Sequence, residues 1–281
     1  LTAGATLGGR HLLEATLDRP VTIAYGATSA GDVPPARLTF ALSDFDVGRL
    51  RALLPRELGR RLVDGQVSAR ATVDIREAGQ QITARGTLDG DALVLAPAGT
   101  ALPPLGVRSG FDVTANAAEQ HVAIHHSSVE ITRHGGEAGM LEAFGDLDMR
   151  AGAGTLQIRA ESFDLTLPAL ATGVALTTGT LDTDTVVTLA DSGQTVGVSG
   201  RSAWSGLEIA LSQGAAPFAV PPGRLEVEAT AGPSEVAIDN LAADLGEHGS
   251  LTATGRLDVT GVAGEIRTQQ QIYDLDLVNH Y

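Results

Sequence analysis

Alternation of apolar and polar residues along short runs is the feature that most constrains the fold of this 281-residue chain. In one run, polar residues alternate with Val67, Ala69, Ala71, Val73 and Ile75. Successive side chains of a β-strand point to opposite faces, so this period of two predicts a strand with one apolar face. Similar alternation recurs over residues 82–88, 111–115, 122–124, 129–131, 156–167, 181–189, 207–211 and 225–229. We therefore predict an all-β fold with antiparallel strands.

Turn sequences separate these runs. The clearest are Asp89-Gly90, Asp191-Ser192-Gly193 and Pro221-Pro222-Gly223, because Gly, Pro and Asp favour the backbone angles of tight turns. We predict hairpin connections at these positions.

One segment departs from the period of two. Leucines recur at spacings of three and four between residues 47 and 63, with arginines between them. Asp46 is placed to cap the start of a helix, Gly65 to follow its end, and Pro55 to kink it. We predict one kinked helix or two short ones near residues 47–63.

The chain also resembles itself at an offset of about 114 residues. Gly65, Gly86 and Pro103 fall on Gly179, Gly200 and Pro217, and the apolar positions keep the same phase. Phe45-Asp46-Val47, Phe163-Asp164-Leu165 and Tyr273-Asp274-Leu275 mark three similar unit starts. We predict the end of a preceding repeat at 1–44, repeat units at 45–162 and 163–272, and the start of a truncated repeat at 273–281. Repeats of this kind form elongated arrays in which each unit contacts its neighbours.

The charge of the chain limits its partners. The sequence has 34 acidic and 19 basic residues, a formal net charge of −15, no Lys and no Cys. Such a balance argues against nucleic acid, whose phosphates require a basic surface. The lack of Cys excludes disulfides and thiolate ligands.

A resemblance narrows the interpretation. The segment SDFDVGRLRALLPRELGRRLVDGQVSARATVDI, which recurs in weaker form as ESFDLTLPALATGVALTTGTLDTDTVVTL, resembles the AsmA and TamB superfamily of bacterial envelope proteins. The resemblance covers about residues 38–281. It implies a long, twisted β-groove with a hydrophobic interior, located in the periplasm and anchored in the inner membrane. It also implies a role in moving phospholipid toward the outer membrane. We expect the anchor in a segment outside these 281 residues.

On this basis we predict a non-enzymatic periplasmic conduit for phospholipid or another acyl-chain lipid, with envelope membrane proteins as further partners. The candidate contacts are the apolar residues of one face of each repeat, which we expect to be the concave face. They are Val67, Val73, Ile75, Ile82, Leu93, Leu95, Phe111, Val113, Val122, Ile124, Leu181, Val187, Leu189, Leu207, Ile209, Leu225, Val227, Val236 and Ile238. The alternatives are a structural or adhesive β-repeat protein with a closed core, and an outer-membrane protein assembly factor that offers an open strand edge.

The sequence offers no constellation for catalysis, and we predict no cofactor or metal site. His121 and His125 would lie about 13 Å apart on a strand, too far to share one ion, and we expect His126 on the opposite face from His125. Asp89-Gly90-Asp91 lacks the Glu that a calcium loop needs, since position 100 is Thr. For Asp46, Asp164 and Asp274 we predict a cap or turn role.

Overall fold

The computed structural model describes residues 1–7, 10–19, 34–50, 62–95, 103–167, 176–209, 218–259 and 263–272, nearly all of them in β-strands. The chain divides into two units, Leu1–Met149 (unit 1) and Arg150–Tyr281 (unit 2). Neither unit's sheet closes into a barrel over the described strands. The all-β, antiparallel fold predicted from the alternation is thus confirmed.

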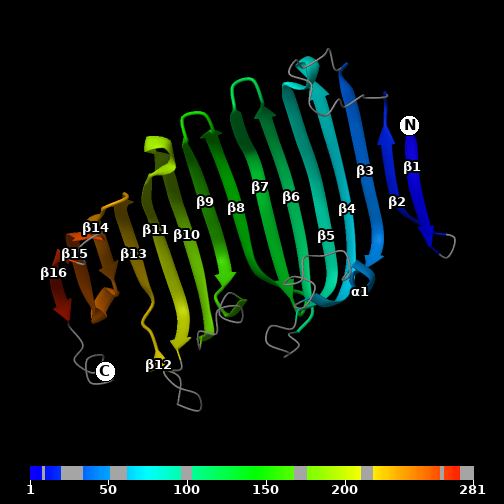
Figure 1. The fold of residues 1–281 in the computed structure, drawn as a ribbon. Coiled ribbons are helices and arrows are strands. Elements are labelled where there is room, and N and C mark those ends of the chain that lie inside the picture. The colour runs from blue at the N-terminus through cyan, green and yellow to red at the C-terminus, as the bar shows by residue number, and fades with distance from the viewer. Residues whose placement is uncertain are drawn as a thin grey trace. The chain divides into compact units, whose positions relative to one another are not determined.

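Unit 1 is an antiparallel sheet whose strands follow one another in chain order (Figure 1). Its strands are β1 (Thr2–Leu7), β2 (Arg10–Leu17), β3 (Ala36–Asp46), β4 (Leu62–Arg76), β5 (Gln81–Leu95), β6 (Leu105–Asn116), β7 (His121–Arg133) and β8 (Gly136–Asp148). A single helical turn, α1 (Val47–Leu50), follows β3.

Unit 2 has the same meander. Its strands are β9 (Ala153–Asp164), β10 (Leu176–Ala190), β11 (Thr195–Ile209), β12 (Phe218–Ala219), β13 (Gly223–Ala231), β14 (Glu235–Asp244), β15 (Gly249–Asp258) and β16 (Ala263–Ile272). The order within the sheet is the chain order, except that the short strand β12 pairs only with β11. When β12 is set aside, consecutive strands of unit 2 therefore pair with each other, as an antiparallel meander requires.

Two hairpins, one in each unit, share their dimensions. Strands β4, β5, β10 and β11 all have 15 residues, and β4 and β10 begin 114 positions apart. The 3₁₀ turns that join them are η1 (Glu77–Gly79) and η3 (Asp191–Gly193), and all three residues of each turn have positive φ. The predicted turn at Asp191-Ser192-Gly193 is confirmed.

The described residues contain very little buried core. Six apolar residues are buried: Ala36, Val47, Leu105, Ala138, Ala160 and Ala253. Within each unit the extensive contacts between strands are those between neighbours in the sheet, and α1 contacts only β3 and β4 in this way. The described part of each unit is thus a single layer, and its side chains lie on one face or the other rather than between two layers.

Three local predictions need correction. Asp89-Gly90-Asp91 is not a turn, because it lies inside β5, where Gly90 pairs with Val67 and Val107. The helical segment predicted near 47–63 is helical over Val47–Leu50, while residues 51–61 lie outside the described residues and Leu62 and Val63 belong to β4. The runs 122–124 and 129–131 belong to one strand, β7. The alternation is interrupted between them because a bulge near His125 adds a residue to the strand.

Candidate apolar binding face

The predicted contact residues of unit 1 lie in rows that cross the strands. Residues paired across an antiparallel sheet have their side chains on the same face. Val73 of β4 pairs with Leu38 of β3 and Ala84 of β5, and the row continues through Val113, Ile124 and Gly145. The next row contains Ala36, Ile75, Ile82, Ala115, Val122 and Leu147. Val67 and Phe111 belong to the same face, which we call the apolar face of unit 1.

Unit 2 has an apolar face of the same kind. One row contains Leu156, Val187, Val198, Ala229, Ile238 and Gly255, and the next contains Leu189, Val196, Ala231, Val236 and Leu257. Leu181, Leu225 and Val227 lie on this face too, by the alternation along their strands. The register therefore brings together the predicted residues within each unit.

The remaining predicted residues lie at strand ends. Leu93 and Leu207 each lie against a glycine of positive φ, Gly65 and Gly179, where an added Cβ would approach the leucine within 2.8 Å and 3.1 Å. Ile209 pairs with Leu176 and Phe218. The side chain of Leu95 lies outside the described residues.

The apolar face is accessible to solvent. Leu38, Ile82, Leu88 and Phe111 expose between 37% and 38% of their surface, values unusual for neighbouring large apolar side chains. Several members of this face were not predicted from the sequence. Once the pairing of one strand with its neighbours is known, the residues paired with a predicted contact identify them. They are Leu38, Phe40, Leu88, Val107, Val129, Ile131, Leu141, Leu147, Val198 and Leu241.

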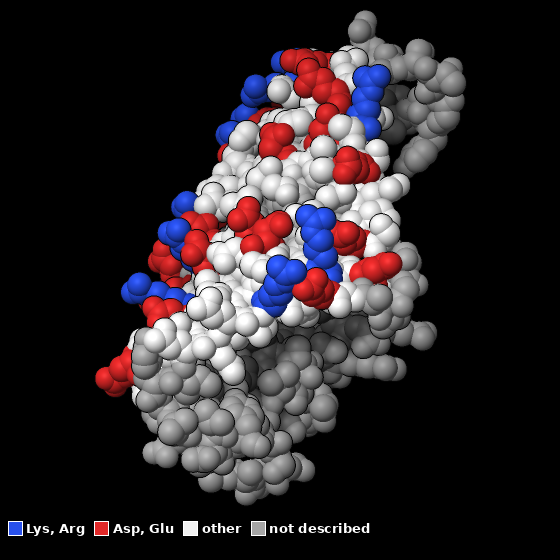
Figure 2. All heavy atoms as spheres, turned by 90° about the vertical axis from the view of Figure 1, so that its left-hand side faces the viewer, with Lys and Arg blue, Asp and Glu red and all other residues white. Residues whose placement is uncertain are grey.

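The opposite face, the polar face, carries cross-strand ion pairs. Arg85 Nε lies 2.9 Å from Asp112 Oδ2, and Arg108 contacts both Asp89 and Glu130, at 3.3 Å and 3.1 Å. Unit 2 has similar pairs between Arg159 and Asp184 and between Arg201 and Glu226. From the side of β16, Figure 2 shows acidic and basic side chains interspersed. Such exposed pairs contribute little to stability but keep this face hydrated.

An open hollow of about 760 Å³ lies over the polar face of unit 2. Its charged lining residues come from β9, β10, β11, β13 and β14. They are Arg159, Glu161, Asp182, Asp184, Arg201, Arg224, Glu226 and Asp244. The side chains of the predicted contact residues point to the other face of the sheet, although Leu225 also borders the hollow. That the apolar face is the concave one therefore stays a prediction.

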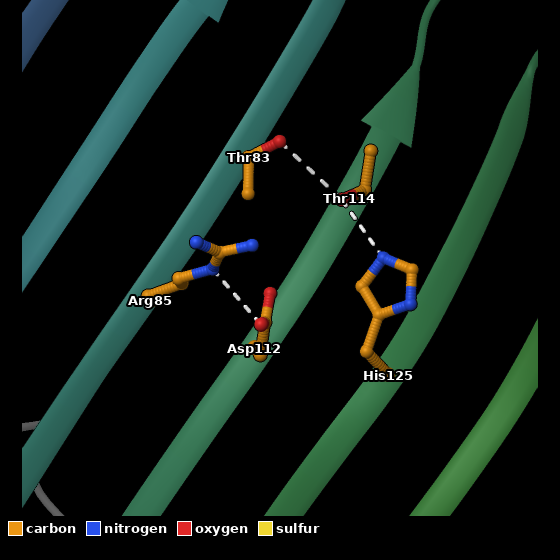
Figure 3. A network of polar contacts seen from close by, with 5 residues as sticks. All are labelled: Thr83, Arg85, Asp112, Thr114 and His125. Atoms are coloured by element: carbon orange, nitrogen blue, oxygen red, sulfur yellow. Dashed lines mark hydrogen bonds and ion pairs between the residues drawn. The ribbon is translucent and has the colours of Figure 1, made fainter.

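The histidines of β7 belong to a hydrogen-bonded surface. His125 Nε2 lies 3.0 Å from Thr114 Oγ1, which lies 3.3 Å from Thr83 Oγ1 (Figure 3). His126 pairs with Asp112 and its ring contacts Phe144, so the bulge places His125 and His126 on the same polar face. The expectation of opposite faces was wrong, because a bulge adds one residue to the strand. Among the described residues no group of three or more His, Asp or Glu side chains could hold a metal ion.

Two of the recurrent aspartates close local turns. Asp46 Oδ1 accepts the backbone N–H of Gly48 at 2.8 Å, and Asp164 Oδ1 accepts that of Thr166 at 2.9 Å. The predicted turn role is confirmed at both positions, while Asp274 lies outside the described residues. Trp204 donates its Nε1–H to the carbonyl of Pro221 at 2.9 Å.

Comparison with known proteins identified no relatives. No protein-family model matches the chain, and neither a curated protein nor a solved structure matches it. A search of the described residues for a helix long and apolar enough to span a membrane found none.

Proposed function

We propose that this chain is a non-enzymatic lipid conduit, in which acyl chains lie against the apolar face and move along it from strand to strand. The supporting observation is the exposed apolar face itself. The row of Val73 in unit 1 and the row of Val187 in unit 2 each cross consecutive strands and contain no charged side chain. No second layer packs on it among the described residues.

The energetics suit movement rather than permanent binding. Full burial of a CH₂ group contributes about 0.8 kcal/mol. A chain that contacts a sheet on one side only gains roughly half of that per CH₂. Because the face offers similar aliphatic side chains on successive strands, the free energy changes little as the chain slides. Lipid head groups would stay in water.

We further propose that the chain is built from repeats of about 114 residues that form an elongated groove in the bacterial envelope. Support for the repeat comes from the two 15-residue hairpins and from their turns, which have positive φ at equivalent positions. Support for the envelope location and for transport between inner and outer membranes is the resemblance of residues 38–281 to the AsmA and TamB superfamily.

The proposal is tested with a pair of adjacent substitutions on β4. Val73 lies on the apolar face and Thr72 on the polar face, so Val73→Asp and Thr72→Asp add the same charge to opposite sides of one strand. We expect Val73→Asp to reduce transfer of fluorescent phospholipid between vesicles by about tenfold or more, since a buried charge against an acyl chain is costly. Thr72→Asp should transfer lipid as the unchanged chain does.

Circular dichroism establishes that both variants are folded. Equal transfer by folded Val73→Asp and by the unchanged chain would contradict the proposal. Absence of any transfer by the unchanged chain would favour the structural or adhesive alternative.

A further inference from the structure

The apolar face of unit 2 contains a cluster of three hydroxyl groups. Thr183 and Thr185 of β10 and Ser202 of β11 are half-buried and lie on this face, by the alternation with Leu181 and Val187 and by the pairing of Thr183 with Ser202. Thr183 Oγ1 lies 3.0 Å from Thr185 Oγ1 and 2.8 Å from Ser202 Oγ. It also donates to the backbone carbonyl of Arg201, at 3.2 Å.

The hydrogen atoms of these three hydroxyls can be assigned by counting. Each hydroxyl has one donor and two acceptor sites. The carbonyl of Arg201 can only accept, so Thr183 donates its single hydrogen there. Thr185 and Ser202 must then donate to Thr183 for all three contacts to be hydrogen bonds. All three donors are used, and the sites left open on Thr185 and Ser202 are acceptors.

The neighbours of the cluster are apolar. Ile158 and Val227 lie in the row of Thr185, and Ala160 and Leu225 lie in the row of Thr183. Gly200 of β11 is the direct partner of Thr185 in this row, and an added Cβ at Gly200 would lie 2.7 Å from Thr185 Oγ1. A side chain at position 200 would crowd that hydroxyl, and glycine leaves it uncovered.

The corresponding place in unit 1 is built differently. Ala69, Ala71 and Leu88, each 114 positions earlier, replace the three hydroxyl residues. Gly86 corresponds to Gly200, but the ring of Phe111 lies over it, since an added Cβ at Gly86 would be 2.6 Å from Phe111 Cζ. At Gly200 the nearest atoms are those of Asp184 and Thr185. In unit 2 a hydroxyl group therefore lies beside the glycine, where unit 1 has an aromatic ring.

We propose that Thr185 and Ser202 form a polar subsite on the apolar face, which binds amphiphiles whose polar part carries a hydrogen-bond donor, a hydroxyl or an amine. An ester carbonyl or an ether oxygen would find no donor there. This inference rests on the proposed function, because the apolar tail must lie on the surrounding aliphatic side chains. A few polar groups in an apolar surface commonly fix the orientation of a bound molecule.

The test compares an alcohol with its methyl ether, in which a methyl group replaces the hydrogen that the alcohol can donate. Binding of 1-dodecanol and of dodecyl methyl ether to the full chain is measured by equilibrium dialysis. One hydrogen bond is commonly equivalent to roughly a three- to tenfold change in affinity. We expect the unchanged chain to bind the alcohol more tightly than the ether by about this factor. The triple variant Thr183→Val, Thr185→Val, Ser202→Ala should lose this preference for the alcohol.

The matched control removes a hydroxyl pair from the other face of the same strands. Thr180 Oγ1 and Ser205 Oγ lie 2.9 Å apart on the polar face, and Thr180→Val with Ser205→Ala should keep the preference for the alcohol. Equal binding of the two probes by the unchanged chain would overturn the subsite but leave the conduit standing. A preference that survives in the folded triple variant would also overturn it. If neither probe binds, the subsite and the proposed function fail together.

Discussion

His121 is a residue whose protonation the fold changes. Its Nε2 lies 2.7 Å from Asp146 Oδ1, and this hydrogen bond raises the pKa of His121 above the ordinary value for histidine. Asp148, its direct partner on β8, and Glu119 add attraction for the proton. Because the folded pKa is raised, the pair stabilises the fold below about pH 6.5 and this contribution is lost as the pH rises through the raised value.

We expect NMR titration of the His121 ring to give a midpoint above that of an unfolded peptide. Asp146→Asn should lower this midpoint, because it removes the carboxylate. It should also reduce the urea midpoint of unfolding at about pH 5.5 more than at about pH 8.5. An unchanged His121 titration in Asp146→Asn would contradict the assigned interaction.

Gly86 is a position on the apolar face of unit 1 that leaves no room for a side chain. An added Cβ would lie 2.6 Å from Phe111 Cζ and 2.7 Å from the carbonyl oxygen of Arg70. Gly86→Ala should therefore lower the free energy of unfolding by about 1–3 kcal/mol, as overpacking does. At Gly110 on the polar face, the atom nearest to an added Cβ would be Ser128 Oγ, 3.3 Å away. Gly110→Ala should therefore change the free energy of unfolding by less than about 0.5 kcal/mol. Urea denaturation measures both, and equal effects would contradict the assignment.

Individual residues differed in how far the sequence predicted them. The turn role of Asp46 and Asp164 followed from their place before a short helical or turn segment, because an Asp side chain accepts backbone N–H groups close in sequence. The arrangement of His125 and His126 could not be predicted in this way, because a bulge shifts the phase of a strand and depends on the partner strand. The hydroxyl cluster of unit 2 escaped notice for a similar reason: Thr183 and Ser202 meet only through the register.

At the scale of elements, the turns η1 and η3 are equivalent parts of two hairpins. Ala78 and Ser192 occupy their central positions with φ values of 55° and 60°. A left-handed conformation costs a non-glycine residue about 1–2 kcal/mol, while glycine adds about 0.4–1 kcal/mol of unfolded-state entropy. Ala78→Gly and Ser192→Gly should each raise the free energy of unfolding by about 0.5–1 kcal/mol.

Thermal and urea unfolding of the two single variants measure this effect. Gly79→Ala provides the opposite control, since φ at Gly79 is 87° and a Cβ there is strained. If Ala78→Gly stabilised the protein and Ser192→Gly destabilised it, the two turns would not be equivalent. That result would count against the proposed repeat.

Strands were predictable where one face is strongly apolar and less so elsewhere. The alternation is regular over residues 67–75 of β4, and that strand was recognised. Strand β16, with the sequence AGEIRTQQQI, has few apolar residues and was not recognised. Asp89-Gly90 has the composition of a turn but lies inside β5, because pairing with β4 and β6 on both sides overrides local preference.

At the scale of the whole molecule, the proposed function depends on the difference between the two faces of each sheet. The alternation predicted that difference, and the register placed the apolar residues of neighbouring strands side by side. The cross-strand ion pairs lie on the polar face, which is where an exposed sheet meets water. What lies against the other face decides between a conduit for lipids and a protein with a closed core.

The most direct measurement is photocrosslinking from two neighbouring positions of β10. Val187 lies on the apolar face and Thr188 on the polar face. A photoreactive amino acid is placed at one or the other position in the full chain, expressed in a bacterial host. The chain is irradiated and purified, and the attached mass is determined. We predict covalently attached lipid at position 187 and none at position 188. Attachment of lipid equally at both positions, or at neither, would contradict this prediction.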